Sequence, residues 1–257
     1  MRPPTFLDLP TRQHKPRTRG ITHVLDKGLS LTATRDHLDA TAEFIDIAKI
    51  GWGISYIDPR LSERAMAYSE AGVLVSLGGT LLEIAAAQGR IGELRDWALA
   101  GGITTIEVSN GLGALDSRRK QELIRTLSED FIVAAEVGSK DSDTPVVATE
   151  WLAEMESDLE AGARWVIAEG RESGTIGIYQ GDGAVRVDLI DTLTSRIPID
   201  RIIFEAPNKT QQVWFVSTLG SEVNLGNIPP EEVLPLETLR LGLRAETAAV
   251  TRLATLA

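Results

Sequence analysis

The stretch Ile132-Val-Ala-Ala-Glu-Val-Gly138 is a short apolar run that closes with a glutamate and a turn-forming glycine. Three other runs share this pattern: Thr104-Thr-Ile-Glu-Val-Ser109, Trp165-Val-Ile-Ala-Glu-Gly170 and Ile202-Ile-Phe-Glu-Ala-Pro207. Strands of a parallel sheet have such apolar sequences because both of their faces are buried. The four runs therefore predict four parallel strands, each with a carboxylate at its carboxyl end: Glu107, Glu136, Glu169 and Glu205.

The rest of the chain extends this pattern to eight strands separated by helices. The predicted strands are Gly20–Leu25, Ile45–Ile50, Val73–Leu77, Thr104–Val108, Ile132–Val137, Trp165–Glu169, Arg201–Glu205 and Glu222–Leu225. The predicted helices are Arg35–Phe44, Leu61–Glu70, Gly92–Ala100, Ser117–Leu127, Val146–Ala161, Val187–Ser195, Gln211–Leu219 and a last helix at Leu236–Leu256. Alternating strands and helices imply a parallel sheet. Eight such units in 257 residues predict an α/β fold with a single (β/α)8 TIM barrel over residues 20–257.

Alternation within the strands predicts which way the glutamates point. Successive side chains of a strand point to opposite faces. If Glu107 points into the barrel, its apolar neighbours Ile106 and Val108 face the helices. The same register directs Glu136 and Glu205 inward. Carboxylates that converge in this way repel one another, so we expect cations beside them.

Composition limits the classes of function. The net charge of −11 and the pI near 4.9 argue against nucleic-acid binding, which needs a basic face. The absence of cysteine excludes disulfides and thiolate chemistry and is consistent with a cytoplasmic enzyme. No apolar run is long enough to predict a membrane span. Residues 1–19 form a basic arm without the apolar core of a signal peptide, and we expect it to cover the barrel bottom or a neighbouring subunit, which leaves a homo-oligomer open.

Active sites of (β/α)8 barrels lie at the carboxyl ends of the strands, where this sequence places both acids and cations. Two or three of the four glutamates could hold Mg²⁺, a hard cation that prefers oxygen ligands. Arg171, Lys209 and the backbone N–H groups near Gly226 are suited to a phosphate group. A salt-bridge network without a metal is the alternative interpretation of the same residues. Lys27, Lys49, Lys140, Asn208 and Asn227 also fall at these predicted strand ends.

These motifs resemble the phosphosulfolactate synthase family from about Arg19 to Thr247. The shared segments are Arg19-Gly-Ile-Thr-His-Val-Leu-Asp-Lys-Gly28, Lys49-Ile-Gly-Trp-Gly53, Gly78-Gly-Thr-Leu-Leu-Glu83, Glu136-Val-Gly-Ser-Lys140, Glu169-Gly-Arg-Glu-Ser-Gly174, Phe204-Glu-Ala-Pro-Asn-Lys-Thr-Gln-Gln-Val213, Val223-Asn-Leu-Gly-Asn-Ile228 and Leu236-Glu-Thr-Leu-Arg-Leu-Gly-Leu-Arg244. The resemblance implies a cytoplasmic barrel enzyme that adds sulfite to phosphoenolpyruvate with Mg²⁺. It also implies small anionic substrates and no nucleic-acid or membrane partner.

The resemblance further implies roles for individual residues. Lys140 matches the lysine of the family's Glu-Val-Gly-x-Lys segment and is the expected proton donor. Lys27 and Lys49 are expected beside it in the catalytic site, where with Arg171 they position the substrate anions. The expected substrate-binding residues are Arg171, Asn208, Lys209, Gly226 and Asn227, and the expected Mg²⁺ ligands are Glu107, Glu136, Glu169 and Glu205.

One segment departs from the family pattern. The fourth strand is followed by Ser109-Asn-Gly-Leu112, where the family has Ser-Asp-Gly-Ser. This change removes a carboxylate and a hydroxyl from the predicted site. It leaves two alternatives to the synthase: a diverged barrel enzyme that uses another nucleophile or phosphorylated acid, and a non-catalytic, stress-associated relative.

Overall fold

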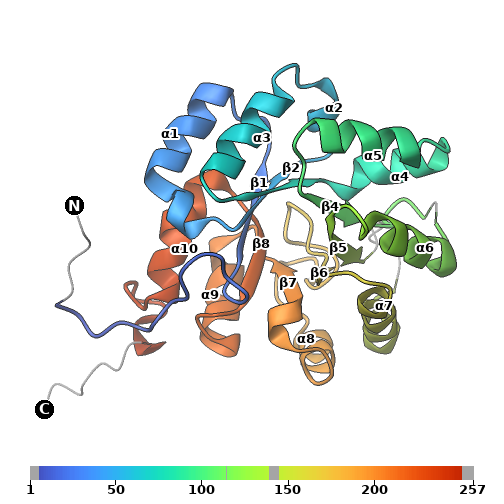
Figure 1. Cartoon of the computed structure of the whole chain (residues 1–257). Coiled ribbons are helices and arrows are strands. Elements are labelled where there is room, and N and C mark those ends of the chain that lie inside the picture. Colours follow the sequence, from blue (N-terminus) through green and yellow to red (C-terminus); the bar gives the residue numbers. More distant parts are fainter. Residues whose placement is uncertain (1–5, 114, 139–144, 251–257) are drawn as a thin grey trace, which may run out of the picture.

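The computed structural model describes residues 6–113, 115–138 and 145–250 and contains a closed barrel of eight parallel strands (Figure 1). Each strand pairs with its neighbours in the sequence, and the last strand pairs with the first. The strands are β1 (Thr22–Asp26), β2 (Ile47–Ile50), β3 (Leu74–Leu77), β4 (Thr105–Val108), β5 (Ile132–Val137), β6 (Trp165–Ala168), β7 (Ile202–Glu205) and β8 (Asn224–Ile228). The predicted (β/α)8 TIM barrel is confirmed.

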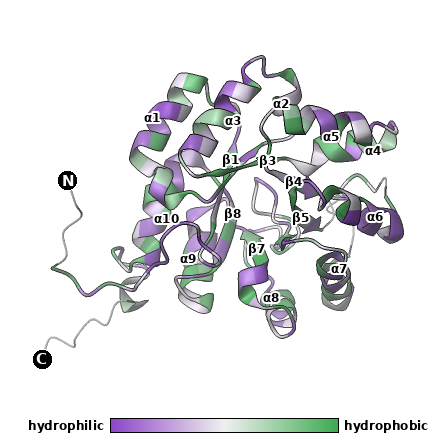
Figure 2. Ribbon diagram, in the orientation of Figure 1, coloured by the Kyte–Doolittle hydropathy of each residue, from purple (hydrophilic) through white to green (hydrophobic). Residues whose placement is uncertain are grey.

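Helices surround the barrel and connect successive strands (Figure 1). They are α1 (Leu31–Thr41), α2 (Ile54–Ile57), α3 (Leu61–Glu70), α4 (Gly79–Ala87), α5 (Ile91–Ala100), α6 (Ser117–Leu127), α7 (Ala148–Glu160), α8 (Val187–Thr194), α9 (Lys209–Leu219) and α10 (Val233–Arg240). Figure 2 shows mixed colours on these helices, because each has one face against the barrel and one toward solvent. Helix α6 is largely polar, and its buried apolar residues are Leu123, Ile124 and Leu127.

Two apolar clusters separate the two faces of the barrel wall. Ile47, Trp165 and Ile203 belong to a small cluster inside the barrel. Ile106 and Val108 belong to the large cluster between the strands and the helices. The predicted register of β4 is therefore confirmed, and the same separation holds for β5 and β7.

The last helix and the last strand differ from the prediction. Helix α10 ends at Arg240, whereas the apolar pattern predicted a helix through Leu256. Gly242 has a φ of 66°, and Leu243 N–H bonds back to the Thr238 carbonyl, which is a glycine-dependent helix end. Only a short 3₁₀ turn at Ala248–Val250 follows, and the rest of the predicted helix lies outside the described residues.

Strand β8 covers Asn224–Ile228 instead of the predicted Glu222–Leu225. Gly226 and Asn227 therefore belong to the strand itself and not to the loop after it. The sequence pattern did not predict two of the helices, α2 and α4. Helix α2 has only four residues, and α4 begins at Gly79, a residue type that is unfavourable inside helices and gives no helix signal.

Charged contacts tie the N-terminal segment to the amino-terminal end of the barrel. Arg12 Nε lies 3.0 Å from Glu237 Oε1 on α10, and Arg17 lies 3.2 Å from Asp46, just before β2. The buried Arg240 guanidinium donates to backbone carbonyls that precede β1 and β8. These contacts occupy the end of the barrel opposite the carboxyl ends of the strands.

No described helix is both long enough and apolar enough to cross a membrane.

Candidate active site

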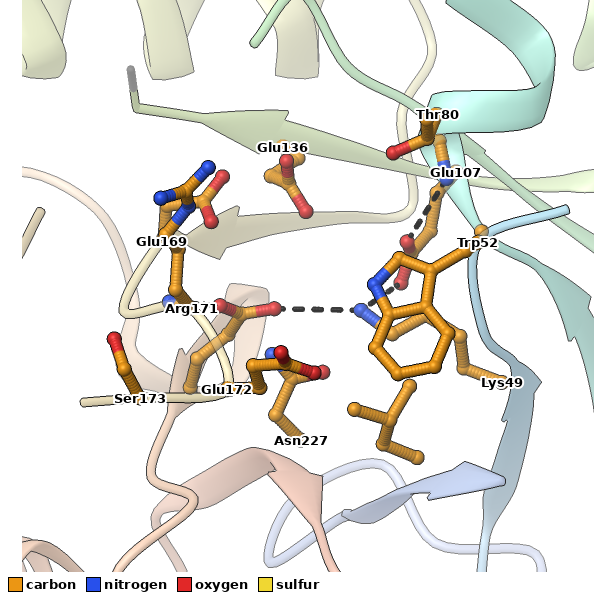
Figure 3. A pocket seen from close by; sticks show the side chains of 14 residues that line it. Lys49, Trp52, Thr80, Glu107, Glu136, Glu169, Arg171, Glu172, Ser173 and Asn227 are labelled. Carbon is orange, nitrogen blue, oxygen red and sulfur yellow. Dashed lines mark hydrogen bonds and ion pairs between the residues drawn. The ribbon is translucent and has the colours of Figure 1, made fainter. Parts of the chain in front are cut away.

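A cavity of about 400 Å³ opens at the carboxyl ends of the strands (Figure 3). We call it the active-site pocket. It is lined by Leu25, Lys49, Trp52, Gly78, Gly79, Thr80, Glu107, Glu136, Glu169, Arg171, Glu172, Ser173, Glu205 and Asn227. All four predicted glutamates are therefore brought together in one pocket, and all four are buried. This convergence follows from the register, since each glutamate lies on the inward face within one residue of the carboxyl end of its strand.

Lys49 forms the central cation of the pocket. Its Nζ lies 3.1 Å from Glu107 Oε1 and 3.3 Å from Glu205 Oε1 (Figure 3). Burial lowers the pKa of Lys49, but the carboxylates of Glu107, Glu205 and Glu136 outweigh burial and hold the pKa above its ordinary value. Lys49 therefore stays protonated and supplies a fixed positive charge. Part of the acidic charge of the pocket is thereby neutralised from within the fold.

Glu107 is the partner of Lys49 on β4. Burial and the neighbouring carboxylates raise its pKa to about 7, and the Lys49 charge opposes this shift. Its second oxygen accepts a hydrogen bond of 3.3 Å from the Gly79 N–H at the start of α4. His23 Nε2 lies 3.4 Å from Glu107, and burial followed by the Lys49 charge lowers the His23 pKa well below its usual value. The imidazole is therefore neutral.

Glu205 contacts both Lys49 and the backbone of the loop after β6. One of its oxygens faces Lys49, and the other accepts hydrogen bonds of 2.9 Å from the backbone N–H groups of both Gly170 and Arg171. Burial and repulsion from Glu136 raise its pKa, against the influence of Lys49 and the Gly170 N–H. Since both oxygens have partners, Glu205 organises the loop after β6 as well as the charge of the pocket.

Glu136 and Glu169 form a carboxyl pair on the other side of the pocket. A hydrogen bond joins their side chains, and burial followed by repulsion from Glu136 and Glu205 raises the Glu169 pKa well above its usual value. The buried Glu169 Oε2 has no hydrogen-bond partner among the described residues. Paired carboxylates of this kind either share a proton or receive a cation, and their oxygens are of the type that Mg²⁺ prefers. The residues present therefore fit a Mg²⁺ ion.

The four glutamates differ in how far their oxygens already have partners within the protein. Within residues 6–113, 115–138 and 145–250, no group of three or more acidic or histidine side chains is arranged to hold a metal ion. Glu107 and Glu205 are occupied by Lys49 and by backbone N–H groups. Substrate oxygens and water would then complete the coordination, as is usual for Mg²⁺.

Among the described residues, Arg171 is a cation of the pocket without an acidic partner. Its guanidinium forms no hydrogen bond or ion pair with any residue in the described part of the chain. Its backbone adopts a φ of 55°, an uncommon conformation for a residue with a side chain. Asn227, which also lines the pocket, has a φ of 53°, and its buried Oδ1 has no hydrogen-bond partner in the part of the chain that the structure describes. Unsatisfied polar groups that face a pocket are candidates for ligand contacts.

The glycine pair after β3 has a steric reason. Gly78 precedes α4, and Gly79 is its first residue. A Cβ atom on Gly79 would lie 2.2 Å from Ser109 Oγ, so no larger residue fits there. Ser109 in turn donates a short hydrogen bond to the buried Glu83 carboxylate. The close approach places the uncapped start of α4 at the pocket wall, where its N–H groups favour negative charge.

Several predicted residues do not line the pocket. Lys27 is half exposed and lies 3.8 Å from Glu172, at the mouth. Lys209 pairs with Glu246, and Asn208 donates to the Ser173 carbonyl. Gly226 faces the barrel interior, where a Cβ atom on this residue would lie 3.0 Å from His23 Nδ1. Lys140 lies outside the described residues.

The departure from the family pattern also lies away from the pocket lining. The Asn110 side chain exchanges two hydrogen bonds with the Leu115 backbone, at 2.6 and 2.8 Å. Leu112 is exposed, and its N–H bonds to Glu83. Among the described residues, neither side chain borders the active-site pocket.

Sequence reasoning missed His23 and Ser173. His23 lacks any metal-ligand spacing, but strand alternation could have found it, because it lies on the inward face of β1 two residues before Leu25, which lines the pocket. Ser173 belongs to the loop after β6, where its neighbour Arg171 was the visible signal.

The fold and the site together define a (β/α)8-barrel enzyme whose small-molecule site lies at the carboxyl ends of the strands. The model of the (2R)-phospho-3-sulfolactate synthase family matches residues 10–246. The chain belongs to the phosphosulfolactate synthase family.

Three phosphosulfolactate synthases show how close the relationship is. The protein from Methanothermobacter thermautotrophicus is 43% identical over 244 residues, which cover 93% of this chain and 95% of the relative. The protein from Bacillus subtilis is 41% identical over 244 residues, covering 94% and 97%. The protein from Methanocaldococcus jannaschii is 40% identical over 235 residues, covering 89% and 94%. The predicted family is therefore confirmed.

Solved structures resemble this chain in fold alone. The 3-hexulose-6-phosphate synthase from Salmonella typhimurium aligns with a TM-score of 0.53 and 16% identity, covering 90% of this chain and 95% of that one. The thiamine phosphate pyrophosphorylase from Pyrococcus furiosus aligns with a TM-score of 0.53 and 12% identity, covering 91% and 96%. These similarities support the barrel and carry no statement about substrate.

Proposed function

We propose that this enzyme adds sulfite to phosphoenolpyruvate in a Mg²⁺-dependent reaction and forms phosphosulfolactate. The observation that carries the proposal is the charge arrangement of the pocket. It has a fixed cation at Lys49, a carboxyl pair at Glu136 and Glu169, and at Arg171 a cation without an acidic partner in the described part of the chain. Both substrates are anions, and an acidic protein can bind them only where local cations offset its overall charge. Membership of the phosphosulfolactate synthase family supports the same reaction.

The chemistry requires charge stabilisation followed by proton transfer. The sulfur lone pair of sulfite forms a C–S bond with the methylene carbon of phosphoenolpyruvate. The electron pair of the carbon–carbon double bond then moves toward the carboxylate, and the adjacent carbon takes up one proton. The phosphate group remains attached throughout. Groups that bind the negative charge more strongly as it develops lower the barrier.

The protein side chains divide these tasks. Lys49 holds a permanent positive charge in the barrel, and Arg171 is free to pair with a phosphate or carboxylate oxygen. Lys140 is proposed as the proton donor, since it matches the lysine of the family's Glu-Val-Gly-x-Lys segment. The buried walls exclude water and strengthen each of these charge interactions. Asn227 also lines the pocket, near the end of β8.

A bound Mg²⁺ ion would be held by Glu136 and Glu169 and would stabilise negative charge on the substrate carboxylate. Glu107 and Glu205 then keep Lys49 in place and set the charge around the ion. The raised pKa of Glu169 is consistent with this assignment, because ion binding would relieve the repulsion between the paired carboxylates.

The test is a reconstitution with purified protein. Sulfite, phosphoenolpyruvate and Mg²⁺ are supplied together and with each one left out, and loss of phosphoenolpyruvate and formation of phosphosulfolactate are followed by phosphorus NMR. We expect product only in the complete mixture. Another nucleophile that replaces sulfite with higher efficiency, or no product in the complete mixture, would refute the proposed substrate pair.

A further inference from the structure

We propose that Gln211 is a positioning residue that, together with Asn208, holds the turn Gly170–Gly174 against the pocket. The position of this turn then sets the affinity for the anionic end of the substrate. We call residues 170–174 the arginine turn. The inference rests on the proposed function for its ligand, a phosphorylated carboxylic acid. It concerns Asn208, which precedes α9, and Gln211 in its first turn, and neither residue lines the pocket.

The buried side-chain amide of Gln211 joins the start of α9 to the arginine turn. Its Nε2 donates to the Gly174 carbonyl at 2.7 Å and to the Gly183 carbonyl at 3.5 Å. Its Oε1 accepts from the Asn208 N–H at 3.2 Å, at the start of α9. Only 2% of the residue is exposed, so water does not replace these bonds. The start of the helix and the arginine turn are thereby fixed relative to each other.

The side chains of Asn208 and Glu205 also form hydrogen bonds to the arginine turn. Asn208 Nδ2 donates to the Ser173 carbonyl at 3.1 Å, and Glu205 accepts from the N–H groups at the beginning of the turn. Glu205, Asn208 and Gln211 follow one another at intervals of three residues. One short segment of the seventh β/α unit therefore holds the arginine turn at both of its ends.

The backbone conformation of the arginine turn explains why these hydrogen bonds are needed. Arg171 has a φ of 55° and Gly174 a φ of 65°. A Cβ atom on Gly174 would lie 2.4 Å from Gln211 Nε2 and 2.5 Å from Asn208 Nδ2, so the glycine allows the two amides to approach. A residue with a side chain persists in the left-handed region only when surrounding contacts enforce it. The contacts from the 205–211 segment present the Arg171 guanidinium to the pocket (Figure 3).

The test uses two substitutions that replace an amide donor by a carboxylate, so each also adds a negative charge. Gln211→Glu keeps the acceptor for the Asn208 N–H but replaces the amide donor with a carboxylate oxygen. Asn208→Asp keeps a side chain that starts helices well and removes the bond to Ser173. Gln212→Glu is the matched control, since this buried amide donates to the Ala206 carbonyl and does not contact the arginine turn. Thermal unfolding shows whether each variant is folded.

In the complete full-length enzyme, we expect Gln211→Glu to raise KM for phosphoenolpyruvate at least about tenfold while kcat changes less than about threefold, which marks a loss of binding rather than of chemistry. Asn208→Asp should show a smaller effect of the same kind, and Gln212→Glu should keep the wild-type KM. Hydrogen exchange in the peptide covering residues 170–178 should accelerate in the first two variants. A folded Gln211→Glu enzyme with unchanged KM would overturn the positioning role.

A second measurement separates this inference from the proposed reaction. Binding of inorganic phosphate is measured by calorimetry for the wild type, Arg171→Ala and Gln211→Glu. We expect both substitutions to weaken binding at least about tenfold. If the wild type binds phosphate but forms no phosphosulfolactate, the proposed reaction fails while the positioning role stands. If Gln211→Glu binds phosphate as tightly as the wild type, or the wild type does not bind it, the positioning role fails.

Discussion

Lys49 Nζ lies 3.1 Å from Glu107 Oε1 inside the barrel, where 5% of Lys49 and 1% of Glu107 are exposed. An ion pair at this depth has lost most of its hydration, and it is maintained only because each charge compensates the other. The lysine comes from β2 and the glutamate from β4, so the pair also joins strands that are not neighbours. Charge placement and barrel stability are therefore coupled in this protein.

Removing the lysine tests that coupling. We expect Lys49→Met to lower the free energy of unfolding by about 3–5 kcal/mol, the usual cost of leaving a buried charge without its partner. Urea unfolding at neutral pH measures the change. The double variant Lys49→Met with Glu107→Gln should be more stable than the single variant, because it removes the orphaned carboxylate. An unchanged urea midpoint in Lys49→Met would show that the pair contributes nothing to stability.

The carboxyl pair provides a prediction about the metal. Glu169→Gln and Glu136→Gln should each raise the Mg²⁺ concentration for half-maximal activity by at least about tenfold, since even residues that only support metal ligands have effects of this size. Glu93→Gln serves as the control, because Glu93 on α5 is an exposed carboxylate that pairs with Arg90, away from the pocket. Mg²⁺ titrations of activity and calorimetry with Mg²⁺ provide the two readouts. Full activity after exhaustive chelation would contradict the metal requirement.

The fold was predictable from the sequence because barrel strands leave a strong local signal. Runs such as Ile202-Ile-Phe-Glu205 are short, apolar and followed by turn residues, and their alternation fixes which side chains point inward. The end of α10 was not predictable from the apolar pattern, because that pattern continues past Gly242. The local backbone of one glycine outweighed the periodicity.

The site was predictable in part, for a related reason. Strand ends indicated that Glu107 and Glu205 would converge, but not that Lys49 would lie between them. That contact depends on the curvature and closure of the barrel, which no single segment encodes. Strand alternation alone likewise did not reveal that Asn208 and Lys209 point away from the pocket, since both follow β7 in a loop and helix start.

A pH dependence of stability follows from a buried ion pair in the helix layer. Asp158 on α7 lies 2.7 Å from Lys120 on α6, and burial raises the Asp158 pKa to about 6 from 3.8 despite that lysine. The folded state therefore holds the Asp158 proton more tightly than the unfolded state does. The resulting stabilisation is complete below about pH 4 and is lost as the pH rises through about 6.

Urea unfolding between pH 4 and 7 measures this effect. A pKa change from 3.8 to about 6 corresponds to about 3 kcal/mol of stability that the protein loses across this range. Asp158→Asn cannot titrate, so we expect its stability profile to be flatter than that of the wild type over the same interval. Parallel profiles for the two proteins would show that Asp158 is not the titrating group.

Lys140 provides the most direct prediction about the chemistry. Its assignment as proton donor follows from the family motif, and its position lies outside the described residues. We expect Lys140→Ala to lower kcat by about a hundredfold or more, the usual range for loss of a general acid. Substrate affinity should fall less, because Lys49 and Arg171 still hold the anions.

Steady-state kinetics at saturating phosphoenolpyruvate and sulfite measure this effect, and Arg118→Ala, an exposed substitution on α6, controls for the loss of one positive charge. The competing hypothesis is that Lys140 is a loop cation that pairs with Asp141 or Asp143. In that case the variant would have a higher KM and the wild-type kcat, because removal of an ion pair weakens binding without removing the proton donor. The ratio of the two kinetic parameters therefore decides the role, and an unchanged kcat rules out Lys140 as the acid.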